Sequence, residues 1–218
     1  ADTFEADSPY AGAVTAYDSP IFIADAAVYL MATQPELGIT DPYALDQTQF
    51  DAAMALLEQQ KALVGEYWSD YTKAIQAFNS GTTAIGTSWQ VIANLAKAEG
   101  GKVEATKAKE GATGWSDTWM IVNDTPNINC AYKWVDHIAS PETNAQVAEW
   151  FGEAPSNAKS CDLTADKAFC ETFHAGDTEY WKDVYYWNTP TATCLDGRTD
   201  TQCVPSRESA TAWSALRS

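Results

Sequence analysis

The chain has 218 residues, of which 45% are hydrophobic and 12% aromatic, enough for one large or two small folded domains with a substantial core. Its formal charge of −17 argues against nucleic acid and anionic membranes as partners and permits a cationic ligand, although acidity also simply favours solubility. No apolar run approaches the ~18 residues that a membrane span needs. The opening ADTFEADSPYAG has no starting Met or signal-peptide pattern, and we expect a processed or truncated end there.

The first half of the chain alternates between predicted strands and helices. A short strand at 14–18 ends at Asp18, and a helix follows with Ser19 as N-cap and Pro20 at its first position. Apolar residues at helical spacing predict another helix over 48–64. The elements predicted next are a strand within 65–70, a helix at 70–81, a strand at 82–89 and a helix at 90–101.

The second half continues this alternation. Strands are predicted at 102–108 and 118–124, and helices at 127–140, 141–152, 165–176 and 206–218, while the aromatic stretch 177–190 receives no assignment. Trp119, Trp134 and Trp150 are predicted to be core residues, because they lie on apolar faces of these elements. The alternation indicates an α/β fold with a mostly parallel sheet flanked by helices.

The five cysteines predict two local disulfides. Eight residues separate Cys161 from Cys170, and eight separate Cys194 from Cys203, and such short loops suit local pairs and an oxidising compartment. Cys130 lies in an apolar helical pattern and is interpreted as a buried free thiol rather than a nucleophile. A zinc site is not expected, because there is no C-x-x-C pair and only two His are present.

Candidate binding residues cluster where predicted strands begin or end. In GWSDTWMIVND (114–124) an extended backbone would place Trp115 and Asp117 on one face, which suits an ammonium group beside an alkyl chain. The alternative for Asp117 is a solvated strand start. Asp18 and Trp89 follow other strands, so that two carboxylates and two indoles would border one crevice. Asp18 also suits a helix N-terminus, where the dipole favours a carboxylate.

Catalytic patterns are weak throughout the sequence. Ser156 and Lys159 form an S-x-x-K match of the kind expected by chance, and neither His137 nor His174 belongs to a recognisable triad. No phosphate-binding loop is present in the sequence either. We therefore expect neither an enzyme nor a cofactor or metal requirement.

Several stretches together resemble bacterial extracellular solute-binding proteins of ABC importers, and among these the spermidine/putrescine type. They are AYDSPIFIADAAVYL, FDAAMALLEQQKALV, AFNSGTTAIGTSW, EGATGWSDTWMIVNDTPN and CAYKWVDHIASPETNAQVAEWFGEAPSN, within residues 14–190. The resemblance implies a periplasmic-binding-protein-like (type II) fold, whose two α/β lobes clamp the ligand and present it to a membrane permease. It also implies an extracytoplasmic location, in the periplasm, anchored at the cell surface or secreted.

The resemblance also implies a domain plan in which the N-terminal part of the first lobe would precede residue 1. Residues 1–12 would be a lead-in, 13–115 with 164–218 the second lobe with a C-terminal disulfide tail, and 116–163 part of the first lobe. We expect apolar surface to be exposed on 116–163, or covered by another copy of the chain.

Family binding residues transfer only where the motif matches. Asp18 and Asp117 correspond to carboxylates that bind ammonium groups, and Trp115 corresponds to the aromatic wall. Where the resemblance implies a second acidic residue in contact with the ligand, this chain has Ile21, so that contact is lost. The remaining ligand-binding candidates are Trp89 and Glu153, which stand near or at family aromatic positions, and the pair Trp187 and Asn188.

The sequence therefore predicts a solute-binding protein that delivers a small organic cation, a polyamine or a related amine, to an ABC importer. The alternative is a secreted interaction or adhesion module that keeps the scaffold without the transport role. In that case the exposed aromatic residues and the cysteine loop would be the working surface.

Overall fold

The structure is a computed structural model and describes residues 2–218. It divides into two compact units, residues 2–115 with 183–218, and residues 116–182. The domain plan placed 164–182 with the second lobe, whereas the structure groups them with 116–163. The reason is local, because the Cys161–Cys170 disulfide crosses that boundary and Phe169 packs beside Ala148. The assignment of lobes itself stays a prediction.

A parallel sheet forms the centre of the first unit. Its strands are β1 (Val14–Tyr17), β2 (Val64–Trp68) and β3 (Ile85–Gly86), in the order β2-β1-β3. The three predicted strands are confirmed at these places, the last one much shortened. A Cβ atom at Gly86 would overlap the carbonyl oxygen of Thr15, so glycine permits the close approach of β3 to β1.

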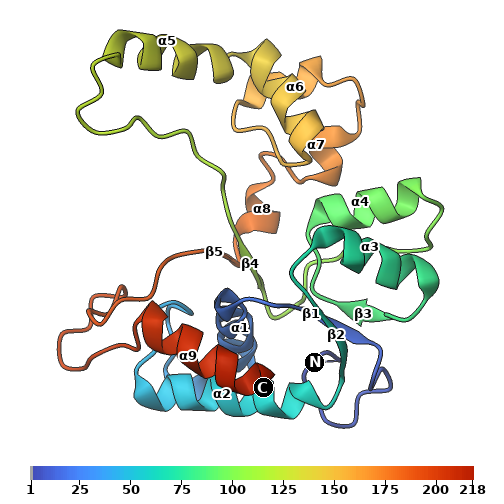
Figure 1. Cartoon of the computed structure of the whole chain (residues 1–218), viewed down its shortest axis with the longest axis vertical. Coiled ribbons are helices and arrows are strands. Elements are labelled where there is room, and N and C mark those ends of the chain that lie inside the picture. Colours follow the sequence, from blue (N-terminus) through green and yellow to red (C-terminus); the bar gives the residue numbers. More distant parts are fainter. Residues whose placement is uncertain (1) are drawn as a thin grey trace. The chain divides into compact units, whose positions relative to one another are not determined.

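Helices cover this sheet as the periodicity predicted. Ser19 Oγ accepts a hydrogen bond from Ile21 N and caps η1 (Pro20–Phe22), which continues into α1 (Ile23–Thr33). Asp46 and Gln49 form a capping box at the start of α2. The remaining elements are η2 (Pro35–Leu37), α2 (Gln47–Lys61), α3 (Tyr71–Ser80), α4 (Gln90–Ala98) and α9 (Ser206–Arg217), with α3 and α4 side by side in Figure 1.

Two apolar clusters hold the first unit together. One joins α1, α2 and α9 through Phe22, Leu30, Phe50, Leu57 and Trp213, all buried. The other joins α3 and α4 around Trp68. Burial of such side chains is the main favourable term in folding, about 1.5–3 kcal/mol for each large aliphatic residue.

A second parallel pair of strands also belongs to the first unit. It consists of β4 (Ala112–Gly114) and β5 (Val184–Tyr186), the latter in the stretch that had no assignment. The strand predicted at 102–108 is wrong, since the structure has no strand there. That stretch alternates apolar and charged residues, but only Val103 packs against a core cluster.

The second unit is helical. It contains α5 (Ile128–Ile138), α6 (Pro141–Phe151), η3 (Ala158–Leu163), α7 (Phe169–Thr172) and α8 (Thr178–Trp181). The helices predicted at 127–140 and 141–152 are confirmed, while the one predicted at 165–176 is reduced to the single turn of α7. The strand predicted at 118–124 is wrong, because this segment has no ladder partner among residues 2–218.

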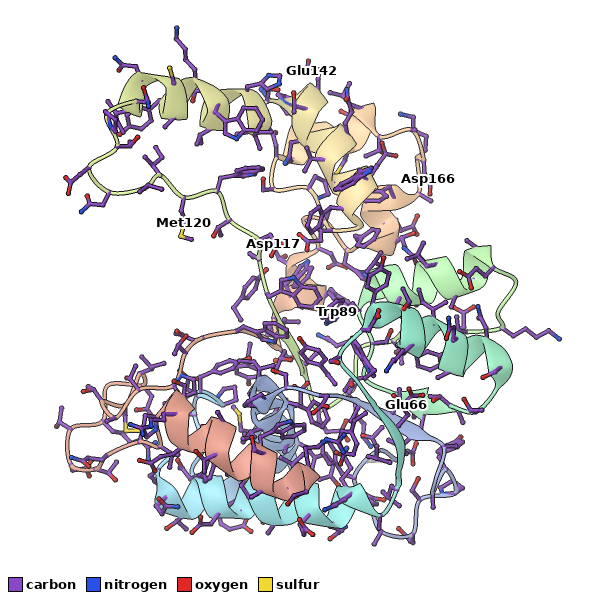
Figure 2. All side chains as sticks on the ribbon, viewed as in Figure 1. Glu66, Trp89, Asp117, Met120, Glu142 and Asp166 are labelled. Atoms are coloured by element: carbon purple, nitrogen blue, oxygen red, sulfur yellow. A yellow bond between two sulfur atoms is a disulfide. The ribbon has the colours of Figure 1, made fainter. Side chains whose placement is uncertain are left out.

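Apolar side chains are exposed on this second unit, as expected. Trp119, Trp134 and Trp150 are 58%, 51% and 84% exposed, so their predicted core positions are wrong. Figure 2 shows Met120, which is 85% exposed, on the extended segment that precedes α5. The second unit does have apolar side chains at the predicted spacing, but among the described residues it has no sheet against which they could pack.

The cysteines pair as predicted, Cys161 with Cys170 and Cys194 with Cys203. Cys130 is free but exposed, so the prediction of a buried thiol is wrong. Its helix α5 is amphipathic, yet Ile138 is the one buried residue of this helix among the described residues. Across residues 2–218, every helix is too short or too polar to cross a bilayer.

Candidate functional site

Aromatic side chains gather at the carboxyl ends of the strands of the first unit. Tyr17 and Trp68 are the last residues of β1 and β2, Trp115 and Trp187 directly follow β4 and β5, and Trp89 comes three residues after β3. Carboxyl ends of parallel strands are where α/β folds bind ligands. We call these five residues the aromatic cluster.

Tyr17 is the centre of the aromatic cluster. Its ring centroid lies 4.8 Å from that of Trp68 and 5.6 Å from that of Trp89. The ring of Trp187 lies 6.1 Å away and is nearly parallel to it, at 8°. These separations are typical of stacked and edge-to-face pairs, so the rings support one another.

The indoles also contact each other. The Trp89 centroid lies 5.1 Å from those of Trp68 and Trp115, and Trp115 lies 5.1 Å from Trp187. Trp68 is buried, whereas the other members are partly exposed. Figure 2 marks Trp89 at the start of α4. Exposed ring faces carry negative potential, so this surface can attract an organic cation.

Two polar details accompany the rings. Trp68 Nε1 donates to the carbonyl of Thr87 at 3.2 Å, while Thr87 Oγ1 accepts from Tyr17 N at 3.0 Å, which fixes the inner rings. Trp187 Nε1 is buried and has no hydrogen-bond partner within residues 2–218. Buried N–H donors normally have a hydrogen-bond acceptor, and an acceptor atom of a ligand could provide one here.

Asp18, predicted to hold an ammonium group, is paired inside the first unit. Its Oδ1 accepts from Trp213 Nε1 at 3.0 Å and from Arg217 Nε at 3.2 Å. The Arg217 guanidinium also lies 3.5 Å from the centroid of the Tyr67 ring. Sequence reasoning identified the position of Asp18 at a strand end but missed both of its α9 partners.

Asn188 does not join the aromatic cluster but lines a separate cavity of about 260 Å³. Its Oδ1 accepts a hydrogen bond from Thr189 N. Other walls of the cavity come from Ser19, Ile21 and Phe50, and none of the described residues that line it is charged. Trp187 and Asn188 are consecutive, but Trp187 belongs to the aromatic cluster and Asn188 lines the separate cavity.

Asp117 and Glu153 belong to the second unit. Asp117 is exposed on the extended segment before α5, without a hydrogen bond or ion pair to another described residue (Figure 2). Glu153 directly follows Gly152, which ends α6 in a left-handed conformation, and its backbone N–H donates to Ala148 O at 3.2 Å. Ligand contacts by both residues stay predictions.

Tyr17 and Trp68 complete the cluster, although neither was a predicted site residue. The signal that could have found them was an aromatic residue near the end of the predicted strands at 14–18 and 65–70. No group of three or more His, Cys, Asp or Glu within residues 2–218 is arranged to hold a metal ion.

Solved structures share this fold at low sequence identity. The PBP MotA from A. tumefaciens B6, in complex with glucopine, matches with a TM-score of 0.67 and 18% identity over 99% of this chain. PotD of Streptococcus pneumoniae, a spermidine/putrescine ABC transporter substrate-binding protein in complex with calcium and HEPES, matches with a TM-score of 0.66 and 16% identity over 100%. A protein of Listeria monocytogenes, assigned as a spermidine/putrescine ABC transporter, matches with a TM-score of 0.69 and 15% identity over 97%.

The chain spans only part of these proteins, covering 66%, 61% and 59% of the MotA, PotD and Listeria chains respectively. The predicted α/β architecture, with parallel strands flanked by helices as in periplasmic binding proteins, is confirmed by these matches. The family model for bacterial extracellular solute-binding proteins matches residues 2–171, which is 170 of the 218 residues. Since that match covers more than half of the chain, the chain belongs to the bacterial extracellular solute-binding protein family.

Proposed function

We propose that this chain is part of an extracytoplasmic protein that captures a small organic cation, a polyamine or a related amine, and delivers it to the permease of an ABC importer. The observation that carries the proposal is the aromatic cluster at the carboxyl ends of the strands. Family membership and the two local disulfides support a location outside the cytoplasm. Within that location, the periplasm, the cell surface and secretion all fit.

Each candidate residue has a proposed role. Trp115, Trp89 and Trp187 would stack on the alkyl part of the ligand and contribute cation–π attraction of about 0.5–2 kcal/mol. Asp117 would accept hydrogen bonds from the ammonium group, because a carboxylate that loses water on binding needs a cation. Ligand contacts by Asp18, Asn188 and Glu153 are further proposals from the family resemblance, although Asp18 is paired with Trp213 and Arg217 and Asn188 lines a separate cavity.

The test is a tryptophan-fluorescence titration of the full natural protein that contains this sequence. The panel holds putrescine, spermidine, γ-aminobutyrate and choline, with a neutral sugar and a dicarboxylate as controls. A saturable change with an amine alone supports the proposal. A response restricted to a control, or silence across the panel, overturns it.

Calorimetry then tests Asp117 directly. Asp117→Asn removes the charge with little change of shape, and we expect amine binding to weaken at least about tenfold. Asp136→Asn is the matched control, since Asp136 is also an exposed carboxylate of the second unit. Equal affinity of the wild type and the Asp117 variant would refute the assigned role.

A secreted interaction module is the second candidate, favoured by the exposed side chains of Trp119, Met120 and Trp150. Large exposed apolar residues are common at protein-binding surfaces. This function predicts no thermal stabilisation by any amine of the panel. Thermal stabilisation that saturates with one amine would decide against it.

A further inference from the structure

Backbone oxygens beside the aromatic cluster already accept hydrogen bonds within the protein. The carbonyl of Trp68 accepts from Asp18 N at 2.8 Å, and the carbonyl of Thr87 accepts from Trp68 Nε1 at 3.2 Å. The carbonyl of Gly114 accepts from Trp187 N at 2.7 Å. These three oxygens are therefore engaged before a ligand reaches the rings.

The rings themselves offer few acceptor atoms. An indole carries an N–H donor and no acceptor, so the Tyr17 hydroxyl is the one acceptor that the side chains of the cluster can supply. Trp187 Nε1 is in addition a buried donor that has no hydrogen-bond partner within residues 2–218. The partly exposed members are Tyr17, Trp89, Trp115 and Trp187. They present aromatic faces and donors far more than acceptors.

Carboxylates near the strand ends of the first unit make other contacts. Tyr17 and Asp18 are consecutive in an extended segment, so their side chains point to opposite faces of the sheet. Asp18 Oδ1 accordingly accepts from two side chains of α9, which packs with a different apolar cluster from Tyr17. Asp70, two residues after β2, accepts from Thr72 N and Thr72 Oγ1 as the N-cap of α3. Neither carboxylate adds an acceptor to the aromatic cluster.

Two kinds of organic cation make different demands on such a surface. A primary ammonium group carries three N–H donors, and each needs an acceptor when the group leaves water. A quaternary ammonium group has no N–H, and its methyl groups can lie directly against aromatic faces, which attract the charge. Aromatic faces with few acceptors therefore favour the quaternary cation.

We propose that the aromatic cluster selects a quaternary, N-methylated ammonium cation rather than a primary amine or a polyamine. The inference rests on the proposed function and narrows its class of organic cation. No residue of the second unit is needed for this preference. With such a ligand, the contact proposed for Asp117 would act through charge alone, since the ligand has no N–H to donate.

The experiment compares choline with ethanolamine, which share one carbon skeleton and differ by three N-methyl groups. A third probe, 3,3-dimethylbutan-1-ol, has the shape of choline without its charge. Calorimetry on the full natural protein gives these affinities and that of putrescine. We expect choline to bind at least about tenfold more tightly than each of the other three. Ethanolamine and putrescine bring N–H groups that lack acceptors, and the alcohol brings no charge.

Variants of Trp89 separate attraction by the ring from simple packing. Trp89→Leu keeps an apolar side chain but removes an aromatic face, and should reduce the preference for choline over the alcohol at least about threefold. Trp89→Phe keeps an aromatic face and should retain most of that preference. Trp150→Leu is the matched control, because Trp150 is 84% exposed on α6 and lies outside the cluster. It should leave the preference unchanged.

The outcomes distinguish the two proposals. If choline is preferred to ethanolamine or putrescine by less than about tenfold while these amines bind, this inference is overturned and the proposed function stands. Equal binding of choline and its uncharged analogue, or a Trp89→Leu variant that weakens both equally, also overturns the inference. If none of these cations and no amine of the earlier panel binds, the proposed function fails, and the inference fails with it.

Discussion

Thr113 donates a hydrogen bond to Asp25 Oδ1 at 3.1 Å and thereby joins β4 to α1. Burial raises the pKa of Asp25 from 3.8 to about 7, since hydrogen bonds from Thr113 and from the Asp25 backbone offset only part of the desolvation. Burial and the carboxylates of Asp25 and Asp41 raise the pKa of the neighbouring Tyr43 as well. The carboxyl group of Asp25 is thus partly protonated near neutral pH.

This pKa predicts a pH-dependent stability. The folded form holds the Asp25 proton more tightly than the unfolded form, so the contribution of Asp25 is complete below pH 3.8 and lost as pH rises to about 7. The limiting slope is about 1.4 kcal/mol per pH unit. Asp25→Asn should therefore raise the melting temperature at pH 8 and leave it nearly unchanged at pH 4. A wild type and a variant that melt in parallel at all pH values would contradict this.

Trp68 anchors the inner side of the aromatic cluster. It is 1% exposed, and its Nε1 donates to the carbonyl of Thr87. Trp68→Phe should lower the free energy of unfolding by about 2–3 kcal/mol, because it leaves a void and an unpaired carbonyl. Urea denaturation measures this, with Trp150→Phe as the control at an exposed position. Equal losses in both variants would show that Trp68 is not a core anchor.

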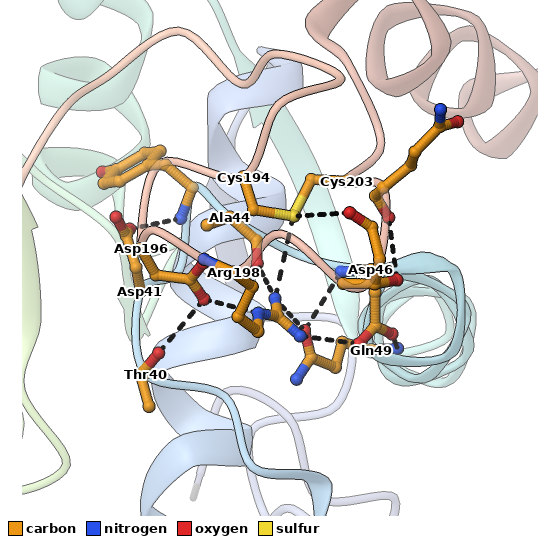
Figure 3. Close-up of polar contacts among 12 residues, drawn as sticks. Thr40, Asp41, Ala44, Asp46, Gln49, Cys194, Asp196, Arg198 and Cys203 are labelled. Carbon is orange, nitrogen blue, oxygen red and sulfur yellow. Dashed lines mark hydrogen bonds and ion pairs between the residues drawn. A yellow bond between two sulfur atoms is a disulfide. The ribbon is translucent and has the colours of Figure 1, made fainter.

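Arg198 connects the C-terminal loop to the start of α2 (Figure 3). Its Nη1 donates to Asp46 Oδ2 at 2.8 Å, its Nε to Asp196 Oδ2 at 2.7 Å, and its Nη2 to Gln49 Oε1 at 3.1 Å and to Ala44 O. Burial alone would raise the pKa of Asp196, but hydrogen bonds from the Arg198 backbone and side chain hold it below its usual value.

Removing this guanidinium should destabilise the first unit. Arg198→Met leaves Asp46 and Asp196 without their shared cation and weakens the cap of α2, and we expect a loss of about 2 kcal/mol at pH 7. Arg207→Met, on an exposed helix face, should stay within about 0.5 kcal/mol of the wild type. Chemical denaturation of both variants checks this. A smaller loss for Arg198→Met than for Arg207→Met would refute the network's contribution.

Cys130 should be the one reactive thiol in the folded chain. The other four of the five cysteines form disulfides, and Cys130 is exposed on α5. A thiol reagent without denaturant or reductant should therefore label one site per chain, and peptide mapping should place the label on Cys130. Labelling that begins only after denaturation would mean that this thiol is covered in solution.

Local sequence patterns were sufficient for several features. Ser19 and Pro20 marked the start of a helix, because capping and a fixed φ act within one turn. The short loops that end at Cys170 and Cys203 were enough to predict both disulfides. The predicted strands at β1 and β2 and the helices around them also depended on nearest-neighbour periodicity.

Patterns did not reveal whether a predicted apolar face has anything to pack against. Trp134 and Trp150 lie on apolar helix faces, yet both are exposed. Residues 118–124 form an apolar run typical of a buried parallel strand, yet this segment pairs with no strand among residues 2–218. An amphipathic period reports which side of an element would be buried. Burial itself requires a second element, which periodicity cannot supply.

By itself the sequence determined that Asp18 and Trp89 stand at the ends of predicted strands. The tertiary structure alone decided that the rings of the aromatic cluster converge, and that Arg217, 199 residues further along the chain, pairs with Asp18. Contacts of such separation depend on the path of the whole chain and on how α9 packs. No local periodicity or motif encodes them.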